Sequence, residues 1–155
     1  MLSNQIVTAA FMNSGQICVA LKRIYVHSSI YREFVQEMVN FTKSINVGDG
    51  FSETNESFYI GPIQNSMQFE RVKGFIKEAE ERGLTIPVGG SEAMSKLPEK
   101  GYFITPTLVD NPPDNERLVV EEPFGMSSFL SSFLFPCLCL CFPYDSCLVF
   151  LRYRD

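Results

Sequence analysis

The stretch FMNSGQICVALKRIYVHSSIYREFVQEMV, residues 11–39, contains three consecutive local patterns that together indicate an α/β fold. A turn rich in Asn, Ser and Gly comes first and carries Cys18. The run RIYVH at 23–27 is short, β-branched and aromatic, which predicts a strand. The serine pair after it can cap a helix. Apolar residues then recur at four-residue spacing on one predicted helical face: Ile30, Phe34 and Met38, with Tyr31, Val35 and Val39 one position later.

The rest of the first 125 residues continues the alternation of strands and helices. Residues 46–62 are dense in Gly, Ser, Asn and acidic side chains, which predicts an exposed loop. A second helix is expected from Asn65 or Ser66 to a stop at Gly83, followed by a strand over 85–90 and an extended stretch over 104–110. This order is typical of an α/β domain with a mainly parallel sheet flanked by helices.

Composition and charge limit the possible functions. A chain of 155 residues with 45% hydrophobic and 20% charged residues is expected to form one globular domain. The net charge of −5 disfavours binding to nucleic acid and to anionic membranes. The first residues match neither a secretory signal nor a transit peptide, so a cytoplasmic location is expected.

The composition changes abruptly after Gly125, which predicts two regions, 1–125 and 126–155. The second is rich in Ser, Phe, Leu and Cys, shows neither helical nor strand periodicity, and is expected to be irregular. A membrane span over 126–144 and a metal site formed by three alternating cysteines, Cys137, Cys139 and Cys141, are two interpretations. The favoured third interpretation is a translated intron or a shifted reading frame, because these residue types have pyrimidine-rich codons. No metal site is expected.

Cys18 allows two interpretations. A lone cysteine among apolar neighbours is usually a small buried side chain. The turn at 13–16 can instead present the thiol to a cleft, where backbone N–H groups favour the thiolate. His27, the only histidine, lies at a predicted strand end and is interpreted as structural rather than as a base for Cys18.

The motif FMNSGQIC resembles the catalytic-cysteine motif of the NAD(P)-dependent aldehyde dehydrogenase superfamily. The resemblance continues through KRIYVHSSIYREFV, VGDG, GPIQNSMQFERVKGFI, Gly89-Gly90, GYFITPTLVD and EEPFG, and so covers residues 1–125. It implies that Cys18 is the nucleophile, that Glu122 holds the nicotinamide ribose and that Phe124 lies beside the nicotinamide. It also implies that Gln68 lies near the adenosine end of the cofactor. Glu122 and Gln68 each have an alternative interpretation as solvated surface side chains.

The resemblance further implies a partial catalytic domain that oxidises an aldehyde to a carboxylic acid with NAD or NADP, through a thiohemiacetal and a thioester on Cys18. The family's cofactor-binding domain, with its Gly-rich turn and its Glu general base, is not found in these residues, so the chain alone is expected to be inactive. Family members form homo-oligomers, but much of that interface is also missing here. The alternative is a non-catalytic fragment that associates with full-length subunits. Neither the aldehyde nor the choice between NAD and NADP is determined by this sequence.

Overall fold

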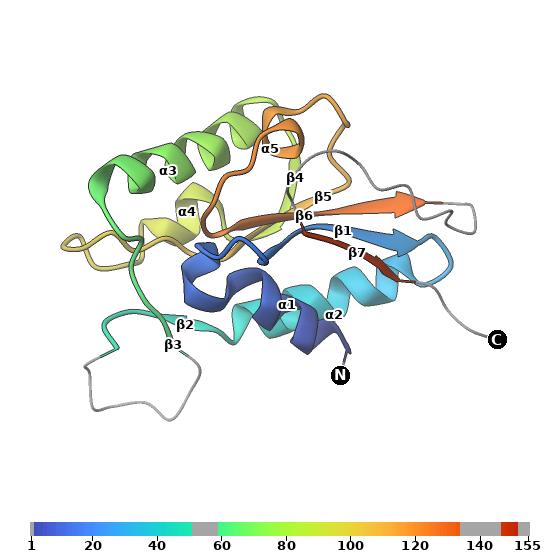
Figure 1. Ribbon diagram of the computed structural model, residues 1–155, viewed down its shortest axis with the longest axis horizontal. Helices are drawn as coiled ribbons and strands as arrows, with labels where there is room; N and C mark the ends of the chain where they lie inside the picture. Colours follow the sequence, from blue (N-terminus) through green and yellow to red (C-terminus); the bar gives the residue numbers. More distant parts are fainter. Residues whose placement is uncertain (1, 51–58, 134–146, 152–155) are drawn as a thin grey trace.

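The computed structural model describes residues 2–50, 59–133 and 147–151, and in these it shows a β-sheet between two layers of helices (Figure 1). The sheet has the strand order β4-β5-β6-β1-β7, formed by Thr85–Val88, Thr107–Asp110, Ser127–Phe133, Leu21–His27 and Cys147–Leu151. The pairings of β5 with β6, β6 with β1 and β1 with β7 are parallel, whereas β4 runs antiparallel to β5 at one edge. The predicted α/β class with a mainly parallel sheet is therefore confirmed.

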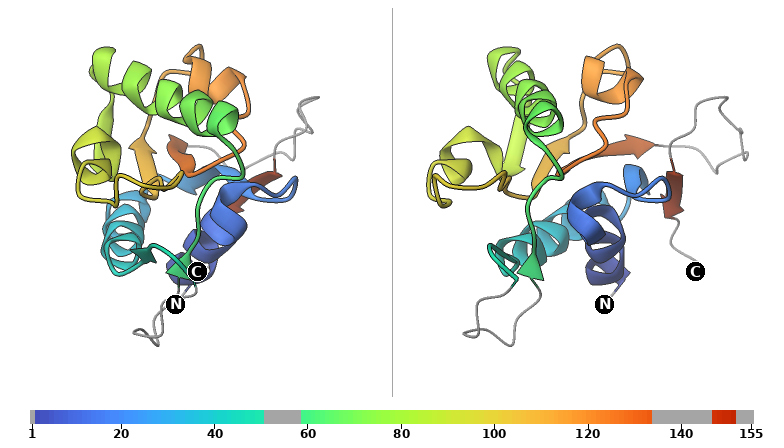
Figure 2. Two further views of the ribbon diagram at one scale, coloured as in Figure 1. Left: turned by 90° about the vertical axis from the view of Figure 1, so that its left-hand side faces the viewer. Right: turned by 60° about the vertical axis from the view of Figure 1, so that its left-hand side comes forward.

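Helices cover both faces of the sheet (Figure 2). Helices α1 (Leu2–Phe11) and α2 (Tyr31–Lys43) lie on one face, and α3 (Ser66–Glu81) and α5 (Arg117–Val120) lie on the other. Neighbouring strand residues therefore enter different clusters, because successive side chains of a strand point to opposite faces. Leu108 packs in the cluster that contains residues of α1 and α2, whereas Val109 packs with residues of α3 and α5.

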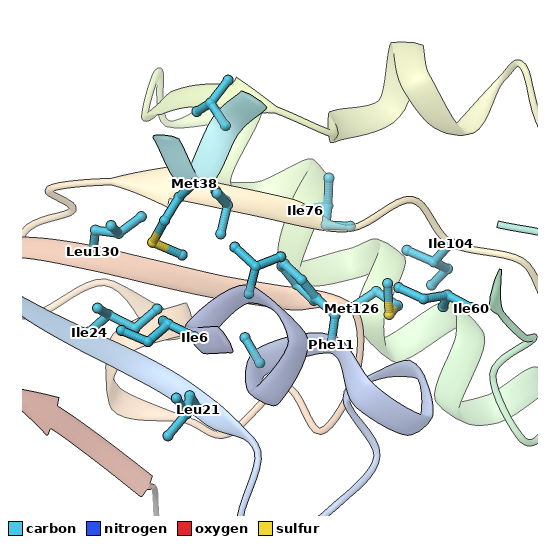
Figure 3. Packing of buried hydrophobic residues seen from close by; sticks show 14 of the residues in the cluster. Ile6, Phe11, Leu21, Ile24, Met38, Ile60, Ile76, Ile104, Met126 and Leu130 are labelled. Atoms are coloured by element: carbon cyan, nitrogen blue, oxygen red, sulfur yellow. The ribbon is translucent and has the colours of Figure 1, made fainter. Parts of the chain in front are cut away.

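The larger cluster joins elements that are far apart in the sequence. Phe11 of α1, Ile24 of β1, Met38 of α2 and Leu130 of β6 are all fully buried in it (Figure 3). Met126, also fully buried, lies beside Phe11 at the end of β6, so this part of the core supports the segment that follows α1.

The predicted strand and helix after Cys18 are confirmed, but the predicted serine cap is wrong. Helix α2 has Ile30 at its N-cap position and no side-chain cap. The turn before it is closed by the backbone bond from Ile30 N–H to His27 O, at 3.1 Å. Ser29 is engaged elsewhere, since its Oγ lies 2.8 Å from Nδ1 of His27. His27 is the last residue of β1, at the far end of the strand from Cys18, and its structural interpretation stays a prediction.

Helix α3 has the predicted boundaries. The Asn65 side chain accepts a hydrogen bond from Gln68 N–H at 2.9 Å and caps the helix. Gly83 has a φ of +71°, and its N–H donates to Glu80 O at 2.9 Å, which ends the helix in a left-handed turn.

Two of the remaining local predictions need correction. The region 46–62 is not only loop, because β2 (Asn46–Val47) and β3 (Tyr59–Ile60) pair in parallel; residues 51–58 lie outside the described residues. The strand predicted over 85–90 ends at Val88, because Gly90 already begins helix α4 (Gly90–Met94).

The expectation that residues 126–155 are irregular is wrong where they are described. Ser127–Phe133 forms β6 in the interior of the sheet, and Cys147–Leu151 forms β7 at an edge. Residues 127–131 are all buried, so the alternation that identifies a strand with one exposed face is lost. The Ser128 hydroxyl is accommodated by donating to Leu21 O at 3.0 Å.

Two alternative interpretations of this region are a membrane span and a metal site. Its proposed membrane span begins with residues that form β6, and no helix in the described ranges has both the length and the apolar character to cross a membrane. Cys137, Cys139 and Cys141 lie outside the described residues. The division of the chain at residue 125 stays a prediction.

Candidate functional site

Three segments that carry the quoted motifs meet near the residues where β1 and β6 begin. They are the cysteine turn (residues 12–20), the segment 61–68 that leads into α3, and the Gly125 turn (residues 121–125). The Ser14 hydroxyl donates to Gly61 O at 2.8 Å, and Gln64 N–H donates to Oε1 of Gln16 at 3.0 Å. The cysteine turn is thus attached to the segment before α3 by polar contacts on both sides of Gly15.

The cysteine turn has an unusual backbone. Asn13, Ser14 and Gly15 have φ values of 52°, 58° and 68°, three consecutive residues in the left-handed region. Each non-glycine residue held there costs about 1–2 kcal/mol, so surrounding contacts have to stabilise the conformation. The bonds of Ser14 and Gln16 described above supply part of that stabilisation.

Cys18 lies in the second half of this turn and is exposed. The backbone bond from Ala20 N–H to Ile17 O, at 2.9 Å, closes the chain around it before β1 begins. The interpretation of Cys18 as a small buried core residue is therefore wrong. Its role as a nucleophile stays a prediction.

The Gly125 turn is attached to α3. Nε2 of Gln68 donates to the carbonyl oxygens of Pro123 and Phe124, both at 2.8 Å. Phe124 has a φ of +49° and is 37% exposed, while the Glu122 side chain is half-buried beside it. Gln68 therefore positions the turn that carries Phe124 and is not simply a solvated surface residue.

An open groove of about 550 Å³ lies between the cysteine turn and α3. Amide and apolar side chains line it, and none of them is charged. The lining residues are Asn13, Gln16, Pro62, Gln64, Asn65, Met67, Gln68 and Phe124. The structure thus brings Gln68 and Phe124 together on the groove with Gln16, two residues before Cys18. Glu122 and Cys18 do not line it.

Lys22 is the site residue that the sequence reasoning missed. It is only 2% exposed, and its Nζ donates to Gly125 O at 2.5 Å. Burial lowers the pKa of Lys22 to about 8, an effect that the nearby Glu122 carboxylate opposes. The signal in the sequence was a lysine inside the apolar run that leads into the first strand. Most residues of such a run are buried, whereas a buried charged side chain is rare.

Two glycines allow the close approach of the two turns. A Cβ at Gly15 would lie 2.3 Å from Gly125 O and 2.5 Å from Nζ of Lys22. A Cβ at Gly125 would lie 2.3 Å from Cγ2 of Val72 on α3. Only glycine therefore fits at either position without movement of its neighbours.

Comparison with known proteins agrees with this arrangement of motifs. The sequence model of the aldehyde dehydrogenase family matches residues 2–126. The chain belongs to the aldehyde dehydrogenase family. It is 37% identical over 118 residues to the mitochondrial aldehyde dehydrogenase of Leishmania tarentolae, a match that covers 76% of this chain and 22% of that protein.

Solved aldehyde dehydrogenases share the fold. The NAD+ complex of the Bacillus cereus aldehyde dehydrogenase superposes with a TM-score of 0.76 at 30% identity, over 86% of this chain and 26% of that one. The Pseudomonas syringae aldehyde dehydrogenase C, a mutant in complex with NAD+ and octanal, gives a TM-score of 0.74 at 28% identity, over 86% and 27%. The chain thus spans about a quarter of the length of these aldehyde dehydrogenases.

Proposed function

We propose that this aldehyde dehydrogenase chain supplies the nucleophile for the oxidation of an aldehyde to a carboxylic acid with NAD+ or NADP+. The observation that carries the proposal is the exposure of Cys18, in a turn that is bonded to the segment before α3 and lies close to the Gly125 turn at Gly15. The nicotinamide cofactor, when bound, supplies a hydride acceptor.

The residues of the chain act on the substrate in a defined order. The Cys18 thiolate adds to the carbonyl carbon of the aldehyde, and the resulting oxyanion of the thiohemiacetal accepts a hydrogen bond from the Cys18 backbone N–H. Loss of hydride from that carbon leaves a thioester on Cys18. Water then hydrolyses the thioester to a carboxylate, and the thiol is regenerated.

The groove has the chemistry for the nicotinamide end of the cofactor. Amide side chains such as Asn13 and Gln64 can bond to carboxamide and hydroxyl groups, and Phe124 offers an exposed aromatic ring. Glu122 is proposed to accept from the ribose hydroxyls. Both Nε2 hydrogen bonds of Gln68 go to backbone carbonyls, so we propose that only its Oε1 can serve the cofactor directly. Among the described residues no lysine or arginine lines the groove, so the phosphates are proposed to be held elsewhere.

The function of Cys18 can be tested without the cofactor. An activated ester such as p-nitrophenyl acetate acylates a reactive thiol and needs no hydride transfer. We expect a burst of nitrophenolate and an acetyl group on the peptide that contains Cys18, detected by mass spectrometry. In Cys18→Ser the burst should be smaller and no acetyl group should appear on that peptide. Acylation that is equal in the native and the unfolded chain would contradict a folded nucleophilic site.

Complete turnover is a separate expectation. Hydride transfer needs a held cofactor at near-attack distance, and loss of such positioning costs several kcal/mol. We therefore expect the 155-residue chain with an aldehyde and NAD+ or NADP+ to give no measurable NADH or NADPH. Robust production of either by the purified chain would overturn this expectation.

A second candidate follows from the length of the match. A chain that spans about a quarter of its relatives could act by associating with full-length subunits and not by catalysis. Co-purification of the chain with a full-length family member would support this candidate. Mixtures of that full-length protein with Cys18→Ser should then show the same acylation burst as mixtures with the wild-type chain. We further propose a cytosolic location, which fractionation of cells expressing the chain would test.

A further inference from the structure

The geometry points to Lys22 as a positioning residue: its buried ammonium group holds the cysteine turn against the Gly125 turn and thereby sets the reactivity of the Cys18 thiol. This inference rests on the proposed role of Cys18 as nucleophile. Lys22 lies at the start of β1, four residues after Cys18, and its bond to Gly125 O joins positions 103 residues apart.

The burial of Lys22 is unfavourable for stability by itself. An ammonium group loses its hydration when it is buried, and this loss is compensated only by good hydrogen bonds or an ion pair. Lys22 is 2% exposed, and its pKa is lowered to about 8 because burial outweighs the attraction of Glu122. An apolar side chain of similar length would fill the same space without this cost, so core packing does not account for a lysine here.

The position of the ammonium group does account for it. Nζ lies against the backbone of Gly15, three residues before Cys18, and donates to the carbonyl of Gly125, which directly follows Phe124. Gln68 attaches the Gly125 turn to α3, and Gln16 attaches the cysteine turn to the segment before α3. Lys22 contacts both turns at the point where they meet.

The charged groups around Lys22 support a role that depends on its charge. Glu122 is the carboxylate that acts on the ammonium group from the Gly125 turn. Arg71 of α3 donates to Glu122 O at 3.4 Å and pairs with Glu121 at 3.7 Å, so it faces the same turn from the helix side. On the segment of Lys22 itself, the neighbouring charged residue is Arg23, whose guanidinium donates to Val119 O. Loss of the Lys22 proton would therefore leave the contact between the turns without its cation.

The test measures alkylation of Cys18 by iodoacetamide in the intact 155-residue chain. Trypsin releases residues 1–22 from wild type and Lys22→Arg, and residues 1–23 from Lys22→Met, where it cleaves after Arg23. Cys18 is the only cysteine in either peptide, so mass spectrometry follows this thiol alone. The variants are Lys22→Met, which removes the charge, and Lys22→Arg, which keeps a cation that does not titrate in the range used. Lys100→Met, at an exposed lysine in the loop before β5, is the matched control.

We expect Lys22→Met to slow alkylation about tenfold at neutral pH, the effect of losing one hydrogen bond from a charged donor. Lys22→Arg should retain most of the rate, and Lys100→Met all of it. The ratio of the wild-type rate to the Lys22→Arg rate isolates the effect of the Lys22 proton, because the arginine keeps its charge. This ratio should fall as the pH rises through about 8, where Lys22 loses its proton.

Other results would overturn the inference. Equal rates in Lys22→Met and wild type, or a flat ratio across pH 8, would show that Lys22 only fills space. If Lys22→Met does not fold, the wild-type to Lys22→Arg ratio alone decides. Failure of p-nitrophenyl acetate to acylate Cys18 while the alkylation rates still depend on Lys22 would remove the proposed function and leave the positioning contact intact.

Discussion

Substitution of Gly125 by alanine tests the packing that brings the two turns together. The new Cβ would lie 2.3 Å from Cγ2 of Val72, 3.2 Å from its Cγ1 and 3.4 Å from its Cβ. Ordinary contacts between carbon atoms begin near 3.4 Å, so the overlap with one methyl group exceeds about 1 Å. Val72 is fully buried in α3, and a β-branched side chain in a helix has one strongly preferred rotamer, so it cannot rotate away.

The cost of this overlap follows from its surroundings. Overpacking of a dense core costs about 1–3 kcal/mol in the free energy of unfolding. Gly125 O also accepts from Lys22 Nζ and from Ser127 N–H, at 2.5 and 2.8 Å, so a shift of the turn would strain both bonds. We therefore expect Gly125→Ala to lower the free energy of unfolding by about 2 kcal/mol.

Urea unfolding followed by circular dichroism measures this change, and two further variants control it. Gly74→Ala, in the middle of α3 with open space around its Cβ position, should stabilise the protein by about 0.5–1 kcal/mol. Val72→Ala removes the obstructing methyl groups, so it should lower the cost of Gly125→Ala in a double-mutant cycle by about 1 kcal/mol or more. An unchanged free energy of unfolding in Gly125→Ala, or additive effects in the cycle, would refute the argument.

Three further predictions concern stability. Asn65→Ala removes the side-chain cap of α3 and should lower the free energy of unfolding by about 1 kcal/mol, measured in urea, whereas Asn65→Asp should retain most of it. Phe129→Ala should lower the free energy of unfolding by about 3–5 kcal/mol, because Phe129 is 2% exposed and packs with residues of α3 and α5. A loss below about 1 kcal/mol, close to the effect of a surface substitution, would show that β6 does not pack in the core. Because the pKa of Lys22 is lower in the folded than in the unfolded chain, the unfolded chain binds more protons between pH 8 and 10.5. Wild type should therefore gain stability relative to Lys22→Met as the pH rises through that range, and parallel pH profiles of the two proteins would contradict the burial of a charged Lys22.

Much of the fold could be predicted from the sequence because it depends on local patterns. The strand and helix after Cys18, the start of α3 at Asn65 or Ser66 and the stop at Gly83 depend on side chains a few residues apart. Strand β6 escaped prediction, since a strand buried on both faces loses the alternation that marks it. The serine cap of α2 failed for another reason, because a backbone bond closes the turn while Ser29 bonds to His27 instead.

The sequence by itself determined the family, since several motifs occur in family order over most of the chain. It also identified Cys18, Glu122, Phe124 and Gln68 as candidates, because each lies in a short motif. Only the tertiary structure decided how these motifs meet. The exposure of Cys18 depends on how its turn is held, and the bonds of Gln68 to the Gly125 turn span more than fifty residues. The burial of Lys22 depends on a carbonyl 103 residues away, and no local pattern of side chains encodes a contact at that separation.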